Sequence, residues 1–369
     1  MTHVFHQLAP TKDQVLHCQF SHWYPLYKKH TPKAKVIRPL PKAFIDYLAA
    51  DGIDLPEDGH YEVNMGTGDG EYSDWSEDEE ASTHSSDEDE DGDDDDDDKQ
   101  VKIKTPKRPV AEIFAEFQSI HDDIKATIEE MGPVTPKMNW SAPRDAVWIM
   151  ATNTMKCDNA SDVYLLLNAS NYIMHDISSA FSECDGLTED DLKDVQYELV
   201  LRKWFNVNPA LEFRVFVKDR HIIGITQRDL NFYDYLDALK PTIRNLVDEF
   251  FETVIVDTFP DDDFVMDVYL PRPFDKVFLI DINPFSRKTD SQMYTWHELA
   301  SMNPESIEEY DIRLVTETDK GRFATKEHSE NMVPMDVVNA SLDSHAMAEL
   351  AQQWKELQMK GGDDGEKAT

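Results

Sequence analysis

A strongly acidic stretch divides this chain into two unequal parts. Between residues 69 and 98 the sequence holds 18 Asp or Glu and no Lys or Arg, and it ends in six consecutive aspartates, Asp93 to Asp98. Like charges at this density repel one another and few apolar residues are available for burial, so we expect a disordered acidic linker. The folded part must therefore assemble from one segment before the linker and a longer one after it.

The charge of the whole chain argues against a nucleic-acid or membrane-surface role. Lys plus Arg number 36 and Asp plus Glu 74, a net charge of −38, so the overall field repels phosphate backbones and anionic lipid. No segment has the ~18–20 apolar residues of a membrane helix. Cys18, Cys157 and Cys184 are widely spaced and form no CxxC pair, which predicts reduced, buried thiols and no structural zinc. We expect a cytoplasmic protein that binds neither nucleic acid nor membrane.

Apolar spacing predicts both helices and strands, and hence an α+β class. Residues 14–50 form a folded piece with an aromatic cluster and a short strand, and an amphipathic helix follows the linker at 110–130. Strands are expected at 195–205, 212–219, 221–228, 264–270 and 276–285, with a tight turn near Asp219 and Arg220. A helical region is expected at 232–253, interrupted or started afresh at Pro241. Another helix is possible at 347–357.

The strand at 276–285 carries the strongest chemical signal. Asp281 and Asn283 are two residues apart, so they point to the same side of the strand. The preceding strand carries a lone carboxylate, Asp267, between apolar neighbours, which is costly unless it is paired or binds a cation. Two carboxylates and an amide oxygen suit Mg²⁺. The alternative is that Asp281 and Asn283 cap a turn before Pro284 while Asp267 pairs with an arginine.

Several basic residues lie in or beside the predicted strands of this acidic chain, and they are candidates for phosphate contacts. They are Lys137, Arg202, Lys203, Arg214 and Arg228. Taken singly, each could equally be a solvated residue or half of an ion pair. The sequence has no GxxxxGK[ST] or GxGxxG loop, so neither a P-loop nor a Rossmann mode of nucleotide binding applies.

Five motifs, in this order, resemble the eukaryotic cell division cycle protein 123 family: VLHCQFSHWYP, PKMNWSAPRDAVWI, ELVLRKW, EFRVFVKDRHIIGITQRDLNFYDYL and FLIDINPF. The resemblance covers nearly the whole expected folded part. It implies an ATP-grasp-like fold in which two lobes sandwich a nucleotide, with ATP and Mg²⁺ as cofactors. It also implies an assembly chaperone that binds the gamma subunit of eukaryotic translation initiation factor 2, and so supports translation initiation and cell cycle progression, rather than a conventional enzyme.

The resemblance further implies which residues contact ATP. Lys137 would bind phosphates and Glu212 the ribose, while Ala210 would offer only its backbone. The remaining implied nucleotide contacts are Trp140, Ala142, Arg144, Leu201, Arg202, Lys203, Arg214, Thr226, Gln227 and Arg228, with the strand at 201–203 on the adenine side. Asp267, Asp281 and Asn283 would hold magnesium and thereby the nucleotide.

On this basis we divide the chain into five parts and expect a monomer. Residues 1–65 are the N-terminal part of the first lobe, 66–104 the acidic linker, 105–198 the rest of the first lobe, 199–330 the C-terminal ATP-grasp lobe, and 331–369 a polar tail with a possible partner-binding helix. Two other functions stay open: an ATP-grasp ligase that makes an acylphosphate intermediate, and an acidic interaction protein of the histone-chaperone kind whose functional surface is Asp93 to Asp98.

Overall fold

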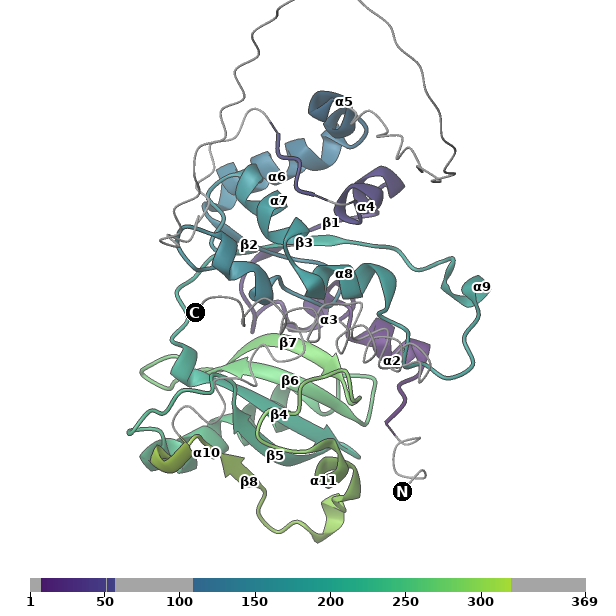
Figure 1. The fold of residues 1–369 in the computed structure, drawn as a ribbon. Helices are drawn as coiled ribbons and strands as arrows, with labels where there is room; N and C mark the ends of the chain where they lie inside the picture. The colour runs from purple at the N-terminus through teal and green to yellow at the C-terminus, as the bar shows by residue number, and fades with distance from the viewer. Residues whose placement is uncertain (1–7, 51, 57–108, 320–369) are drawn as a thin grey trace, which may run out of the picture.

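The protein has two lobes, each built on its own β-sheet (Figure 1). The computed structural model describes residues 8–50, 52–56 and 109–319. The two-lobed α+β class predicted from the sequence is confirmed. The predicted acidic linker at 66–104 and the predicted tail helix after residue 330 lie outside the described residues.

The first lobe contains a three-stranded antiparallel sheet in the order β1-β3-β2. Its strands are β1 (Ala34–Ile37), β2 (Val134–Lys137) and β3 (Leu199–Lys203). Pro136 is tolerated in β2 because an edge strand forms a ladder on one side only. Since β3 is the central strand, the first lobe extends past residue 198, and the predicted boundary at 199 places this strand in the wrong lobe.

Helices cover the sheet of the first lobe (Figure 1). They are α4 (Lys42–Leu48), α5 (Val110–Ala115), α6 (Gln118–Met131), η1 (Arg144–Ile149), α7 (Ala160–Asn168) and α8 (Asn171–Ser178), while α9 (Glu189–Leu192) lies on the loop that connects α8 to β3. The single helix predicted at 110–130 is two helices, because the backbone leaves helical geometry at Phe117 (φ −136°, ψ 33°). The Phe117 ring packs 5.3 Å from the Phe44 ring and 5.1 Å from that of Phe114.

The second lobe contains a five-stranded sheet in the order β7-β6-β4-β5-β8. Its strands are β4 (Glu212–Lys218), β5 (His221–Gln227), β6 (Phe264–Tyr269), β7 (Phe278–Pro284) and β8 (Asp311–Arg313). All neighbours are antiparallel except β5 and β8. The predicted turn is confirmed: Asp219 and Arg220 have φ of 48° and 58°, the pair of positive values that a two-residue type I′ hairpin requires.

Helices pack on both faces of this second sheet. On one face, Ile243 and Val247 of α10 (Lys240–Phe250) share a core with the central strands; on the other, Leu299 of α11 (Trp296–Ser301) packs with Phe216 of β4. Within the helical region predicted at 232–253, the fresh start predicted at Pro241 is confirmed: α10 begins at Lys240, with the proline in its first turn as helices favour. Shorter helical turns are η2 (Pro209–Leu211), η3 (Asp237–Leu239), η4 (Phe251–Ile255), η5 (Pro304–Ser306) and η6 (Glu317–Asp319).

Two N-terminal helices lie between the lobes (Figure 1). A capping box begins α2 (Lys12–His17), and α3 (Phe20–Tyr27) follows it. The aromatic side chains of α3 are buried, and they share one hydrophobic core with Met266 and Ile282 of the second lobe. The N-terminal piece, expected to belong to the first lobe alone, therefore also joins the second.

Two expectations from composition can be compared with the structure. All three cysteines are free, and Cys18 and Cys157 are buried as predicted, while Cys184 is half-buried. Among the residues that the structure describes, no helix is both long and apolar enough to cross a membrane.

Candidate site between the lobes

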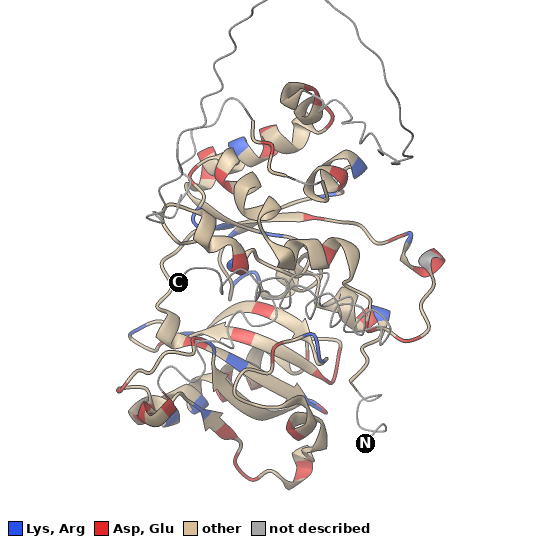
Figure 2. Cartoon of the chain, viewed as in Figure 1, with Lys and Arg blue, Asp and Glu red and all other residues tan. Residues whose placement is uncertain are grey.

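A row of polar residues crosses the sheet of the second lobe. Asp281 of β7 is opposite Asp267 of β6, which is opposite Arg214 of β4, which in turn is opposite Thr226 of β5. Residues directly opposite one another project from the same face of a sheet. Figure 2 shows the acidic positions of β7 and β6 beside a basic position on β4. Polar side chains therefore lie side by side on four neighbouring strands of this sheet.

Asp267 lies at the centre of this row and is paired with arginines. Its two carboxylate oxygens accept hydrogen bonds from Arg214 Nε and Nη2, both at 2.8 Å, and Arg228 Nε is 3.3 Å away. Only 1% of Asp267 is exposed. Burial by itself would raise the pKa of Asp267, but the two arginine charges outweigh burial and lower the pKa to about 2. The arginine pairing that we weighed as the alternative for Asp267 is what the structure shows.

Asp281 instead meets a cation from the other lobe. Its Oδ2 lies 2.7 Å from Lys137 Nζ, at the end of β2. Asn283 lies two residues further along β7, on the same side of the strand. The Asn283 side-chain nitrogen is buried and has no hydrogen-bond partner among the residues that the structure describes. The strand that carries these two residues thus faces the first lobe, with one amide still available for a ligand.

Two more cations of the first lobe reach the second. Arg202 of β3 donates from Nη1 to the carbonyl oxygen of Ile280 at 2.9 Å. Arg144, at the start of η1, lies 3.8 Å from Glu212, measured between Nη1 and Oε2. Together with the pair between Lys137 and Asp281, these contacts join the lobes along the polar face.

The contacts gather cationic side chains between the lobes. Five of them, namely those of Lys137, Arg144, Arg202, Arg214 and Arg228, face the carboxylates of Glu212, Asp267 and Asp281. Two further carboxylates lie near this cluster, Asp176 near Lys137 and Asp290 near Arg214. Burial lowers the pKa of Arg202 and of Arg228, and nearby Arg144 lowers both further. In a protein of net charge −38, a cluster of partly buried arginines is a favourable place for an anion.

Several other residues that were predicted to contact the nucleotide do not face the site between the lobes. Lys203 is exposed, and Leu201 is buried in the first-lobe core. β3 is paired on both sides, so much of the backbone expected to meet adenine is already used by β1 and β2. Gln227 is on the opposite face of β5 from Thr226, where its side chain accepts from the Val315 amide at 3.1 Å.

Trp140 forms hydrogen bonds through both its side chain and its backbone. The Trp140 indole donates to the carbonyl of Val15 at 2.8 Å, and the Trp140 carbonyl accepts from Lys137. Ala142 lies in the same turn. The amide of Ala210, part of the backbone that was expected to meet the nucleotide, donates to Asn208 Oδ1 at 3.2 Å in a helix cap.

The sequence analysis missed Asp176 of α8. Its carboxylate is buried and accepts three hydrogen bonds from Trp140 and Ser141. An isolated aspartate in an amphipathic helix gives no such signal, because its partners are about 35 residues earlier in the chain.

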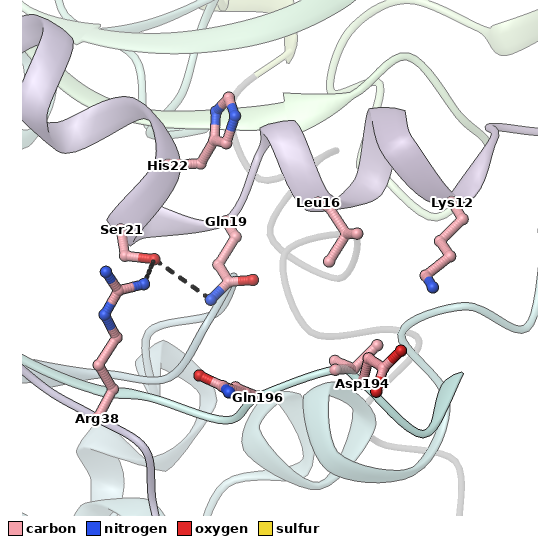
Figure 3. A pocket seen from close by; sticks show the side chains of 9 residues that line it. Lys12, Leu16, Gln19, Ser21, His22, Arg38, Asp194 and Gln196 are labelled. Carbon is pink, nitrogen blue, oxygen red and sulfur yellow. Dashed lines mark hydrogen bonds between the residues drawn. The ribbon is translucent and has the colours of Figure 1, made fainter. Parts of the chain in front are cut away.

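A separate pocket of about 480 Å³ lies away from these residues (Figure 3). Residues of α2 and α3 line one side and residues 194–196 the other, and Arg38 donates to Ser21 Oγ at 3.0 Å at one end. None of the predicted nucleotide contacts lines it, so the site between the lobes is defined by its charged contacts and not by this cavity.

Comparisons with known proteins agree with the motifs. Residues 23–341 match the family model described as D123. The chain is 50% identical to "Cell division cycle protein 123" of Candida glabrata, over 99% of this chain and 98% of that one. It is 51% identical to the "Translation initiation factor eIF2 assembly protein" of Kluyveromyces lactis, over 94% and 92%. The solved structure of Cdc123 from Schizosaccharomyces pombe aligns with a TM-score of 0.63 and 35% identity, over 84% of this chain and all of that one.

Proposed function

The chain belongs to the D123 family, and we propose that it binds ATP and Mg²⁺ between its lobes and acts as an assembly chaperone for eukaryotic translation initiation factor 2. Its partner would be the gamma subunit, and its place of action the cytoplasm, as a monomer. The relatives from yeasts that carry the name of this factor's assembly protein support the role. Through it the chain would support translation initiation and cell cycle progression.

One observation supports the nucleotide part of this proposal: the cluster of one lysine and four arginines between the lobes. A polyphosphate is the anion whose charge and oxygen acceptors suit several arginines and one lysine at once. Lys137 and Arg144 would reach it from the first lobe, while Arg214 and Arg228 would reach it from the second.

The residues at the end of β7 fit a magnesium ion. Asp281 has one oxygen on Lys137, and Asn283 can present its amide oxygen on the same side of the strand. Asp267 is less free, but a carboxylate offers about four lone-pair positions and Arg214 uses two of them. Mg²⁺ prefers such oxygen ligands and commonly shares them with phosphates. When bound, it would neutralise part of the phosphate charge.

Binding alone would suffice for an assembly role. A ligand that binds only the folded state stabilises it by about 2.7 kcal/mol at 100 times its dissociation constant. Here that energy would act on the contacts between the lobes, such as Lys137 to Asp281, and would fix the lobes relative to each other. A fixed pair of lobes can present one rigid surface to the gamma subunit, so we propose that turnover of ATP is not required.

Reconstitution with the purified subunits tests the assembly role. In the presence of ATP and Mg²⁺, the chain should coelute with the isolated gamma subunit and raise the yield of the three-subunit factor. Lys137→Met should lower that yield, whereas Lys156→Met should not, because Lys156 forms a surface pair with Asp158 in the same lobe. A gamma subunit that elutes separately from the wild-type chain would contradict the proposed role.

A further inference from the structure

The turn that follows β2 carries the first-lobe cations of the site. Lys137 ends β2 and Arg144 begins η1, and the backbone between them folds back so that Met138 N donates to Ser141 O at 2.9 Å. Lys137 is fully buried, and its ammonium donates to the Trp140 carbonyl within the same turn. The position of the lysine therefore depends on the position of the turn.

A carboxylate from α8 holds this turn from behind. Asp176 Oδ2 accepts from Trp140 N at 3.0 Å and from Ser141 N at 2.7 Å, and its Oδ1 accepts from Ser141 Oγ at 2.7 Å. Burial raises the pKa of Asp176 to about 6, although the donors from Ser141 and Trp140 oppose the rise. An ionised group kept at such a position costs stability, which favours a role beyond packing.

Asn139 fixes the other side of the turn. Its side chain donates to the Gln196 carbonyl at 2.8 Å and accepts from the Glu198 amide at 2.9 Å. Its own carbonyl accepts from Phe20 N at 2.9 Å, at the start of α3. Asp176 holds the opposite side of the turn at the amides of Trp140 and Ser141, where the Trp140 indole also donates to the Val15 carbonyl.

We propose that Asp176 is a positioning residue for phosphate binding: it fixes the turn at 138–141 so that Lys137 and Arg144 face the second lobe. The inference rests on the proposed binding of ATP between the lobes. It extends that proposal because Asp176 itself touches neither the second-lobe carboxylates nor Lys137 in the hydrogen bonds of the described residues.

The fold provides a matched control. Asp162 of α7 is another buried carboxylate of the first lobe, but it accepts from Asp158 N at 2.9 Å, four residues away, and does not contact the turn. Burial raises its pKa as well. A substitution to Asn at either position removes a buried charge, while only Asp176→Asn loosens the turn.

The experiment compares binding of ATP and of adenosine, both in Mg²⁺ buffer, by the wild type, Asp176→Asn, Asp162→Asn and the milder Ser141→Ala. Circular dichroism and thermal melting establish that each variant is folded at the temperature used. Asp176→Asn should weaken the binding of ATP by about tenfold and the binding of adenosine by less than about twofold, since adenosine has no phosphate for the cations to bind. Ser141→Ala should show a smaller loss of the same kind, and Asp162→Asn none.

The outcomes separate this inference from the proposed function. Equal ATP affinity for the wild type and both turn variants would overturn the inference while leaving ATP binding intact. Equal losses for ATP and adenosine would also overturn it, because they indicate a general structural effect. If Asp176→Asn does not fold, the loss of ATP affinity in Ser141→Ala, compared with its loss of adenosine affinity, tests the inference by itself. A wild type that binds no ATP would contradict the proposed function, and the inference would fall with it.

Discussion

Lys137 Nζ lies 2.7 Å from Asp281 Oδ2, and the two residues come from different lobes. The lysine ends an edge strand of the first sheet, and the aspartate lies on the edge strand of the second. This pair, with the arginines beside it, joins the lobes at the place where the sequence predicts a nucleotide. In the proposed function the same groups would exchange part of this contact for ATP and Mg²⁺.

Lys137→Met tests the cation of this pair. The change keeps much of the side-chain volume but removes the charge, so ATP should bind at least about tenfold more weakly. Stability should fall by about 1–3 kcal/mol, because Asp281 loses a partner while remaining partly accessible to water. Calorimetric titration with ATP and urea unfolding measure the two effects. Unchanged ATP affinity in Lys137→Met would rule out a phosphate contact by this residue.

Asp267→Asn should be strongly destabilising. It leaves Arg214 and Arg228 without their carboxylate in a buried place, and breaking a buried pair in this way costs about 3–5 kcal/mol. The exposed pair of Asp262 with Arg220 provides a control, and Asp262→Asn should change stability by less than about 1 kcal/mol. Equal unfolding midpoints for the two variants in urea would contradict the central place given to Asp267.

The same carboxylate predicts a loss of stability in acid. Its pKa is about 2 in the folded protein and 3.8 without the fold, so the folded state holds its proton less tightly. The stabilisation of the folded state by the charge of Asp267 is complete above about pH 4 and is lost as the pH falls toward 2. The free energy of unfolding in urea should therefore drop more steeply over this window in the wild type than in Asp267→Asn, and parallel curves would exclude the arginine pairing as the cause.

Two neighbours on α8 should respond to pH in opposite directions. Burial, followed by the charge of Lys288, lowers the pKa of His175 to about 4. The folded protein therefore loses stability as the pH falls from 6.5 toward 4, because the unfolded chain takes up a proton at this histidine and the folded chain does not. Burial raises the pKa of Asp176 from 3.8 to about 6, so the folded state gains stability as the pH falls from 6 toward 4. In melting curves taken across this range, His175→Asn should lose less stability than the wild type and Asp176→Asn more. The reverse order would refute both assignments.

Deleting residues 69–98 separates the proposed function from that of an acidic interaction protein. All residues of the candidate site lie between Lys137 and Asn283, so the shortened chain should bind ATP within about twofold of the wild type. It should also still bind the gamma subunit in pull-down assays. Loss of gamma-subunit binding with ATP binding retained would show that the acidic stretch is itself a functional surface.

The sequence predicted what local patterns determine. Asp281 and Asn283 on one side of a strand, and the turn at Asp219 and Arg220, follow from the period of two and from backbone geometry. The α+β class follows from the same patterns, and the family resemblance added the two lobes. The resemblance also assigned the ligands, yet it could not show that Asp267 meets two arginines in the folded chain.

Tertiary contacts determined the rest. The sequence predicts β3 as the first of three consecutive strands, but in the structure β3 pairs with β1 and β2, which come from distant parts of the chain. The break at Phe117 depends on rings that lie before the acidic stretch, such as that of Phe44. Asp176 likewise acquires its role only when α8 packs behind the turn of Trp140. None of these partners is adjacent in sequence, so periodicity could not reveal them.

The most direct test of the proposed site is a titration of ATP, with and without Mg²⁺, into the wild type, Asp281→Ala and the control Asp275→Ala. Asp275 is exposed and precedes β7, so its loss removes the same charge outside the site. The proposed site predicts magnesium-dependent binding by the wild type and the control, and at least about tenfold weaker binding with little magnesium dependence for Asp281→Ala. Magnesium-dependent binding of ATP by Asp281→Ala, with the affinity of the wild type, would contradict it.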